Sequence, residues 1–157
     1  MFKRFCNCVF PTRPVGGLFV NWDDVDNTCP IFSLAGQEHN AKVVDVYDGD
    51  SIKIVIKLSG TFQKFNCRLA DIDTPELRSK NMNEKLYAHY VKKKVESDLL
   101  NKIIKIKCGK FDKYGRLLGE IYINKNDKKS INQIMIDEGH GYAYEGGTKK
   151  AFKVSAV

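Results

Sequence analysis

Apolar and polar side chains alternate along much of residues 41–70, which is the period of strands that bury one face. The alternation is strict from Ile52 to Leu58, and a valine-rich run begins at Ala41. Asp48-Gly49-Asp50 separates the two runs, and aspartate and glycine favour tight turns. This part of the chain therefore predicts a hairpin, followed by a third strand at about residues 62–70.

A helical period replaces the strand period from about Glu84 to Leu100. Lysines lie between the apolar positions, which indicates a solvated face. The side chains expected to face the core are Leu86, Tyr90, Val91, Val95 and Leu99.

Strands resume at about residues 103–108 and 117–123. Ser130 and Gln133 then form a capping box that predicts a short helix, and Gly139 is its expected stop. Three strands, a helix, two strands and another helix form the element order of an OB-type barrel. We therefore predict an α+β fold that is mainly β, with a five-stranded OB barrel and two to three helices.

Residues 1–40 lack a regular period and contain three of the four prolines. We interpret them as an N-terminal extension, with the domain at residues 41–157. Apolar side chains around Leu18–Trp22 and Ile31–Leu34 predict that part of the extension packs on the domain, because a purely solvated tail would lack them.

The net charge of +7 belongs to the domain, because residues 1–40 carry more acidic than basic side chains. A basic domain favours a polyanionic partner, such as nucleic acid or an anionic membrane; a lysine-rich surface that only aids solubility is the alternative. Arginine is rare, with five residues against 21 lysines. Arg68 and Arg116 lie in the two densest motifs, and a guanidinium binds phosphate in a bidentate manner that lysine cannot reproduce.

The five cysteines have no zinc-ligand spacing and favour free thiols in a reducing compartment. No secretory signal is recognised, so we expect an intracellular protein. Cys6 and Cys8 lie beside basic residues, and a lipid-modified membrane tether at these positions is an alternative to a disordered or packed arm. A viral source is a further alternative. We expect a monomer.

The stretch Arg68-Leu-Ala-Asp-Ile-Asp-Thr-Pro-Glu76 places one guanidinium and three carboxylates directly after a predicted strand. Pro75 disfavours helix at Thr74 and so fixes the loop. An arginine on a strand with carboxylates in the next loop suits a phosphate held beside a metal ion.

Four motifs occur in a fixed order: Asp48-Gly49-Asp50, residues 68–76, Asp112-Lys-Tyr-Gly-Arg116, and Ile131-Asn-Gln ahead of Glu138-Gly139. Over about residues 41–144 they resemble the staphylococcal nuclease (thermonuclease-like) family. The resemblance implies a calcium-dependent phosphodiesterase that acts on DNA and RNA and leaves 5′-hydroxyl and 3′-phosphate ends. An inactive nucleic-acid or protein binding module on the same barrel is the alternative.

The resemblance assigns the metal to Asp50, Asp73 and the backbone carbonyl of Thr74, with Asp48 in a supporting role. Oxygen donors without histidine or cysteine suit calcium, or magnesium as the second choice, and argue against zinc. A structural interpretation is also open: Asp48 and Asp50 shape a turn, and Arg68 pairs with Asp73.

The same resemblance makes Glu76 the partner of the attacking water, and Arg68 and Arg116 the stabilisers of phosphate charge. Lys113 and Tyr114 match positions that hold a nucleotide phosphate. Tyr142 and Tyr144 lie where the family presents tyrosines to the nucleotide, in an ambiguous register, so packing and stacking both stay open; we assign Tyr144 to substrate.

The family normally continues into a long final helix, for which few residues remain after Gly146-Gly147. We expect the apolar part of residues 1–40 to cover the surface that such a helix would bury.

Overall fold

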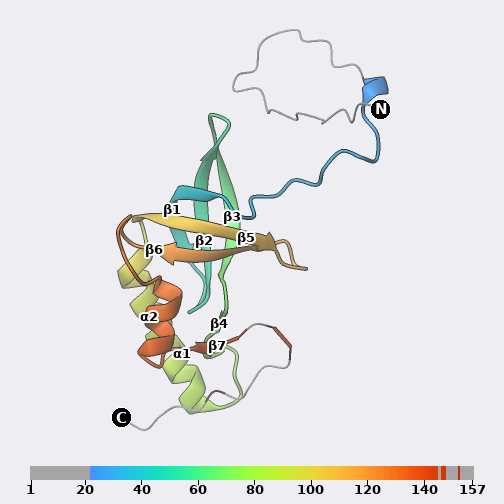
Figure 1. Ribbon diagram of the computed structural model, residues 1–157. Helices are drawn as coiled ribbons and strands as arrows, with labels where there is room; N and C mark the ends of the chain where they lie inside the picture. Colours follow the sequence, from blue (N-terminus) through green and yellow to red (C-terminus); the bar gives the residue numbers. More distant parts are fainter. Residues whose placement is uncertain (1–21, 145, 148–151, 153–157) are drawn as a thin grey trace.

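Five strands form a closed barrel in the order β1-β2-β3-β6-β5 (Figure 1). The structure is a computed structural model that describes residues 22–144, 146–147 and 152. All neighbouring strands are antiparallel except β3 and β6, which are parallel. The predicted five-stranded barrel is confirmed. Its strands are β1 (Glu38–Val46), β2 (Ser51–Leu58), β3 (Thr61–Leu69), β5 (Ile103–Phe111) and β6 (Leu117–Tyr122).

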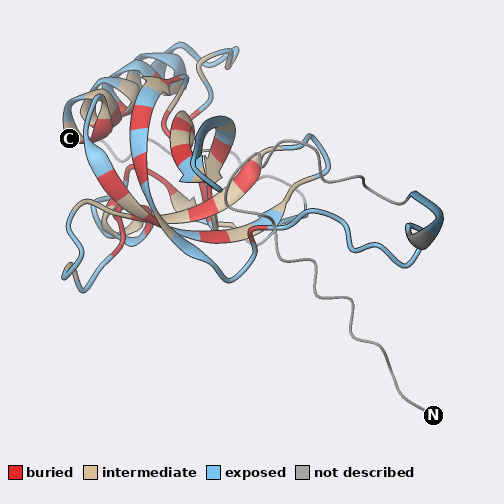
Figure 2. Ribbon diagram, turned by 90° about the horizontal axis from the view of Figure 1, so that it is seen from above, coloured by how far each residue is buried: buried red, intermediate tan, exposed pale blue. Residues whose placement is uncertain are grey.

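The barrel interior is filled by alternate residues of these strands, as the sequence period predicts. Ile54 and Ile56 of β2 are fully buried, and Ile106 and Ile121 meet them from β5 and β6. Buried positions alternate with less buried ones along most of β2 and β6 (Figure 2), whereas β3 is buried only near its end, at Cys67 and Leu69. Branched aliphatic side chains suit such a barrel because they pack well on pleated strands.

The helix α1 (Met82–Leu99) begins after Asn81, whose side-chain oxygen accepts hydrogen bonds from the backbone N–H groups of Asn83 (2.9 Å) and Glu84 (3.4 Å). The prediction that Leu86 and Tyr90 face the core is wrong, since both are exposed. The buried residues of α1 follow one another at intervals of three or four positions and form a different face of the helix: Ala88, Val91, Val95 and Leu99.

The short helix α2 (Ile131–Asp137) follows the capping prediction. The Ser130 hydroxyl accepts a hydrogen bond from the backbone N–H of Gln133 at 3.3 Å. After the helix, Gly139 has a φ of +75°, the left-handed conformation that glycine adopts at little cost. The predicted start and stop of this helix are both confirmed.

A second sheet of two short strands, β4 (Ile72–Asp73) and β7 (Tyr142–Ala143), lies below the barrel in Figure 1. It pairs Ile72 with Ala143 and Asp73 with Tyr142. Next to it, Asp71 has a φ of +60°, and its carbonyl accepts a hydrogen bond from the backbone N–H of Tyr144 at 3.0 Å. The sequence did not predict this ladder, because strands of two residues have no detectable alternation of apolar and polar positions.

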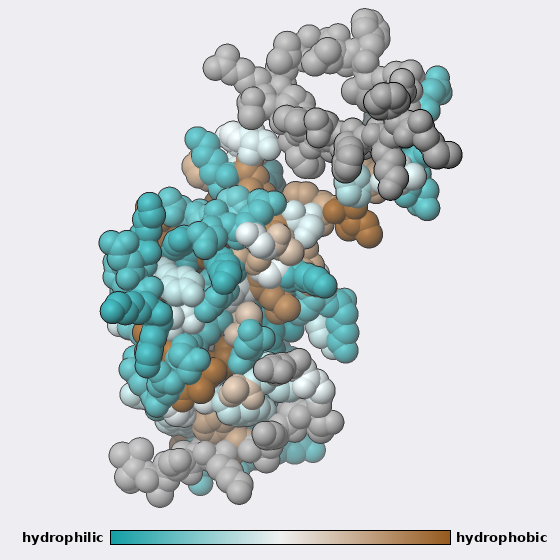
Figure 3. Space-filling view, viewed as in Figure 1, coloured by the Kyte–Doolittle hydropathy of each residue, from teal (hydrophilic) through white to brown (hydrophobic). Residues whose placement is uncertain are grey.

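The described part of the N-terminal segment packs on the barrel only near its end. Leu34 is buried in the core, and the half-exposed ring of Phe32 lies 6.2 Å from that of Phe111. Trp22 and Ile31 are exposed, so the expectation that they pack on the domain is wrong. Apolar side chains of this segment form brown patches on a mainly hydrophilic surface (Figure 3).

The barrel itself begins at Glu38, three residues before the predicted domain start at Ala41. The predicted packing of Leu18–Val20 and the predicted lipid sites Cys6 and Cys8 lie outside the described residues. Cys29, Cys67 and Cys108 are free thiols. Among the described helices, none is long and apolar enough to cross a membrane.

Candidate active site

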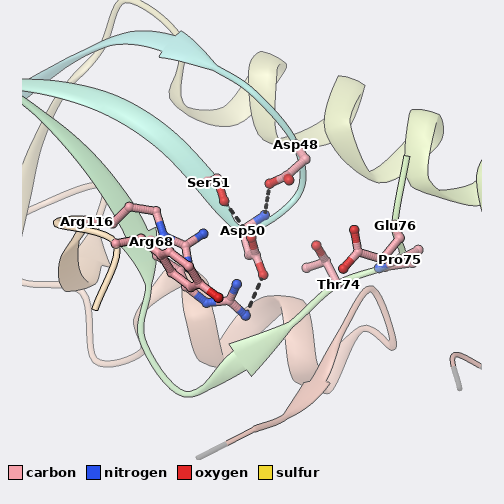
Figure 4. A pocket seen from close by; sticks show the side chains of 9 residues that line it. Asp48, Asp50, Ser51, Arg68, Thr74, Pro75, Glu76 and Arg116 are labelled. Carbon is pink, nitrogen blue, oxygen red and sulfur yellow. Dashed lines mark hydrogen bonds and ion pairs between the residues drawn. The ribbon is translucent and has the colours of Figure 1, made fainter. Parts of the chain in front are cut away.

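A cavity of about 250 Å³ opens where the β1–β2 turn, the end of β3 and the segment after β4 meet. It brings together residues that lie far apart in the sequence, and Figure 4 shows their side chains directed toward a common space. Of the predicted site residues, it is lined by Asp48, Asp50, Arg68, Thr74, Glu76, Tyr114 and Arg116.

Asp50 is the most constrained carboxylate of this cavity. Its side chain is buried, accepts a hydrogen bond from the Ser51 hydroxyl at 2.8 Å, and pairs with Nη2 of Arg68 at 2.9 Å. Burial, and next the nearby charge of Asp48, raise the pKa of Asp50 to about 7. Arg68 opposes this rise without cancelling it, so the site disfavours a negative charge on Asp50 unless more positive charge is present.

The turn that carries Asp50 is shaped by its neighbours. An oxygen of Asp48 accepts a hydrogen bond from the backbone N–H of Asp50 at 3.1 Å. A Cβ at Gly49 would lie 2.7 Å from Oγ1 of Thr74 and 2.8 Å from a methyl of Val91. Only glycine lets this turn approach Thr74 so closely. Asp48 contributes to the turn through its hydrogen bond and adds negative charge beside Asp50.

Arg68 bridges two of the predicted metal ligands. Its Nη2 atom lies 2.9 Å from Asp50 and 2.9 Å from Asp73, and it donates a hydrogen bond to the carbonyl of Ile72 at 3.2 Å. Burial acts to lower the pKa of Arg68, but Asp50 and Asp73 outweigh it and raise that pKa. The guanidinium is therefore held charged between the two carboxylates.

Asp73 lies behind the cavity wall in β4. Its second oxygen accepts a hydrogen bond from the hydroxyl of Tyr142 at 2.7 Å. The β4–β7 ladder places these two residues opposite one another. The sequence left the role of Tyr142 open, because the short ladder that fixes its register has no detectable pattern in the sequence.

The loop after β4 is anchored on the first turn of α1. Glu84 accepts a hydrogen bond from the backbone N–H of Glu76 at 3.3 Å and another from the hydroxyl of Ser79 at 2.6 Å. The side chain of Glu76 is exposed, so its carboxylate faces water while its backbone is fixed. Glu84 was not among the predicted site residues, although an asparagine at position 81 followed three residues later by glutamate is a capping pattern that signals it.

Arg116 is oriented by Asp112 across the β5–β6 turn. One Asp112 oxygen accepts the Nε–H of Arg116 at 2.7 Å, and the other accepts the backbone N–H groups of Tyr114 and Arg116 at 2.8 and 2.9 Å. The exposed ring of Tyr114 lies between two cations, 5.5 Å from the guanidinium of Arg116 and 5.1 Å from Nζ of Lys113. The motif therefore fixes one arginine and leaves an aromatic ring at the surface.

A second cavity of about 670 Å³ adjoins the first, and Arg68, Tyr114 and Arg116 line both. Lys113 and Tyr144 line only this second cavity. The ring of Tyr144 lies 6.0 Å from the guanidinium of Arg68. The predicted substrate residues thus lie beside the predicted catalytic ones and share a wall with them.

Among the described residues, no three histidine, cysteine or acidic side chains converge on one point as metal ligands do. The buried carboxylates of Asp50 and Asp73 both contact the same nitrogen of Arg68, which brings them near one another. Their oxygens and the carbonyl of Thr74 are hard donors of the kind that calcium and magnesium prefer. Burial, and next the charge of Asp48, raise the pKa of Asp50, and a cation beside this carboxylate would offset both, so the donor set fits a divalent cation.

Comparisons with known proteins agree with this geometry. A profile for staphylococcal nuclease homologues matches residues 66–155, which is more than half of the chain and includes every predicted site residue except Asp48 and Asp50. An endonuclease YncB of Bacillus subtilis is 32% identical over 109 residues, which cover 65% of this chain and 48% of that protein.

Two further relatives are each 28% identical to this chain. An uncharacterised endonuclease of Escherichia coli O157:H7 aligns over 106 residues, 68% of this chain and 61% of that protein. An uncharacterised protein of Methanocaldococcus jannaschii aligns over 167 residues, 92% of this chain and 78% of that protein. With its closed five-stranded barrel and the profile match over more than half of its length, the chain belongs to the staphylococcal nuclease family.

Proposed function

We propose that this chain is a calcium-dependent phosphodiesterase that cleaves DNA and RNA internally, leaving 5′-hydroxyl and 3′-phosphate ends. The observation that carries the proposal is one cavity whose wall combines the buried carboxylate of Asp50 with Arg68, Glu76 and Arg116. Relatives that bear the name endonuclease support the same reaction class.

Asp50, Asp73 and the carbonyl of Thr74 would hold the cation. When bound, calcium supplies positive charge beside the scissile phosphate. Magnesium is the second choice, because it demands a stricter octahedral geometry at shorter distances. Arg68 contacts both carboxylates in the structure, so cation binding requires its guanidinium to turn from at least one of them, toward the cavity that it lines.

Arg68 reaches the cavity from β3 and Arg116 from the β5–β6 turn, and both are suited to the non-bridging phosphate oxygens. Hydrolysis builds negative charge on these oxygens, and preorganised cations stabilise that charge without reorganisation. Asp112 fixes the Nε edge of Arg116, which sets the plane of its guanidinium. The two arginines therefore bind the transition state more tightly than the substrate.

Glu76 is suited to accept the proton of the attacking water. Its carboxylate is exposed on the cavity wall, and the hydrogen bond of its backbone to Glu84 holds it in place. Lys113, Tyr114 and Tyr144 would bind the neighbouring nucleotide in the second cavity through a phosphate contact and aromatic surfaces.

Digestion of single-stranded DNA and RNA with calcium, magnesium or chelator tests the proposal. Glu76→Gln is expected to lower kcat by about a hundredfold or more, as for other general bases. The matched control is Glu96→Gln, which changes an acidic residue of α1 that pairs with Lys92 away from the cavity. The ends are checked with polynucleotide kinase, which phosphorylates 5′-hydroxyl ends directly. Cleavage that persists in chelator contradicts the metal assignment.

A binding module without turnover is the second candidate. The observation in its favour is the Arg68 bridge between Asp50 and Asp73, which is also the geometry of a structural ion pair. Binding of nucleic acid with no cleavage under any metal condition would support this candidate and contradict the nuclease.

A further inference from the structure

The outward face of the β2–β3 hairpin extends from Arg68, at the candidate active site, toward the hairpin turn. Strand side chains alternate between two faces, and Ile52, Ile54 and Cys67 point into the core. The opposite set therefore faces outward together with Arg68. Cross-strand pairs of this outward set are Ser51 with Arg68, Lys53 with Asn66, Val55 with Lys64, and Lys57 with Phe62.

Three exposed lysines gather on this outward face. Lys57 and Lys64 belong to the hairpin, and Lys42 of β1 lies opposite Val55. No carboxylate of the described residues forms an ion pair with these three. By contrast, three other lysines of the barrel strands have acidic partners: Lys53 with Asp45, Lys105 with Glu38, and Lys107 with Glu120.

Phe62 adds an aromatic ring to these charges. It is 75% exposed, and Nζ of Lys57 lies 5.8 Å from the centre of its ring. An exposed ring among cations without acidic partners is the arrangement that binds single strands, since bases stack on the ring and lysines meet the phosphates. We call Lys42, Lys57, Phe62 and Lys64 the hairpin surface.

We propose that the hairpin surface binds the single-stranded part of a nucleic acid that extends beyond the candidate active site. Continuity supports the assignment, because Arg68 of the cavity and Phe62 lie on the same face of one strand. The two residues are six positions apart along the strand, or ~20 Å, which a few nucleotides span. The hairpin projects from the barrel (Figure 1). The identity of the ligand rests on the proposed function.

The test compares a Lys57→Gln/Phe62→Ala/Lys64→Gln variant with wild type and a matched control. The control is Trp22→Ala/Lys93→Gln/Lys128→Gln. It removes the same number of positive charges and an aromatic ring that is also 75% exposed, and none of its three residues lines either cavity. Fluorescence anisotropy in chelator, which prevents turnover, measures Kd for a thymidine dodecamer and a dinucleotide at several salt concentrations.

We expect the hairpin variant to raise the dodecamer Kd by about tenfold or more, because base stacking and two phosphate contacts are lost. The rise for the dinucleotide should be about tenfold smaller, since so short a ligand cannot span the ~20 Å from the cavity. The salt dependence of log K should fall by about 1.4, or about 0.7 for each lysine. The control should follow wild type.

Three results would overturn the proposal: an unchanged dodecamer Kd, the same loss in the control, or an equal loss for a duplex, whose paired bases do not stack on Phe62. The proposed function fails separately. If wild type cleaves no strand in calcium but the hairpin variant still loses dodecamer binding, the hairpin surface stands and the nuclease does not.

Discussion

The two sides of the candidate active site are held by different means. In the buried half, the buried carboxylates of Asp50 and Asp73 each contact the partly buried guanidinium of Arg68 at 2.9 Å. Lys113, Tyr114 and Arg116, the exposed half, lie in or beside a turn where Tyr114 is 72% exposed. In the buried half, removing one member leaves another charge without its partner. In the exposed half, water replaces the hydrogen bonds of a removed side chain. Substitutions in the buried half should therefore lower both activity and stability, whereas those in the exposed half should lower activity alone.

The largest effect is expected from Arg68→Ala, which breaks the buried half. It leaves two buried carboxylates without their shared cation, so the free energy of unfolding in chelator should fall by about 3 kcal/mol. Cleavage should fall by about a thousandfold. Urea denaturation and initial rates measure the two effects, with exposed Arg78→Ala as control. Unchanged stability in chelator would show that the comparison between the halves is wrong.

A smaller effect is expected from Tyr142→Phe, which removes only the hydroxyl that contacts Asp73. Partners of this kind orient metal ligands, so calcium affinity should fall by about tenfold. Loss of one hydrogen bond should lower stability by only about 1 kcal/mol. Calorimetric titration with calcium provides the measurement. The matched control is Tyr122→Phe, whose hydroxyl interacts with Glu120; a similar loss of affinity there would remove the specific role of Tyr142.

The smallest effect on stability is expected from Asp112→Asn in the exposed half. The amide keeps the shape but weakens the contact with Nε of Arg116, so kcat should fall by about tenfold. The free energy of unfolding should change by less than about 1 kcal/mol, as for other solvated pairs. Rates and denaturation are compared with Asp127→Asn in the β6–α2 loop. A large loss of stability would place Asp112 with the buried half.

The pH dependence of this pair has a defined sign. Burial acts to raise the pKa of Asp112, but hydrogen bonds from Arg116 and Tyr114 outweigh it and hold that pKa below the ordinary 3.8. Its stabilisation is therefore present at neutral pH and is lost only as the pH falls through the lowered value.

The sequence predicted the barrel because its strands bury one face and therefore alternate strictly, as Ile52 to Leu58 do. Three of the predicted site residues line one cavity, because the barrel brings the end of β3 with Arg68 next to the turns that carry Asp50 and Arg116. The metal, the reaction and the roles of these residues stay predictions.

Other features left weak signals or none. The helix α1 was predicted, but its buried stripe was not, because Leu86 and Tyr90 are apolar in type and exposed in fact. The predicted packing of Trp22 and Ile31 on the domain was wrong for the same reason, since both side chains are apolar but exposed. The contact between Tyr142 and Asp73 depends on a two-residue ladder, and side-chain period cannot reveal a strand of that length.

The β4–β7 ladder also bears on the order in which the site is completed. Asp73 and Tyr142 lie 69 positions apart, so their contact closes a loop that contains α1, two barrel strands and α2. Closing such a loop costs chain entropy that local contacts do not, and contacts of this range form slowly. During synthesis, a nascent chain that lacks residue 142 has Asp50, Arg68 and Asp73 but not the hydroxyl that holds Asp73. The buried half thus reaches its full set of contacts only after all five barrel strands and both helices have been synthesised.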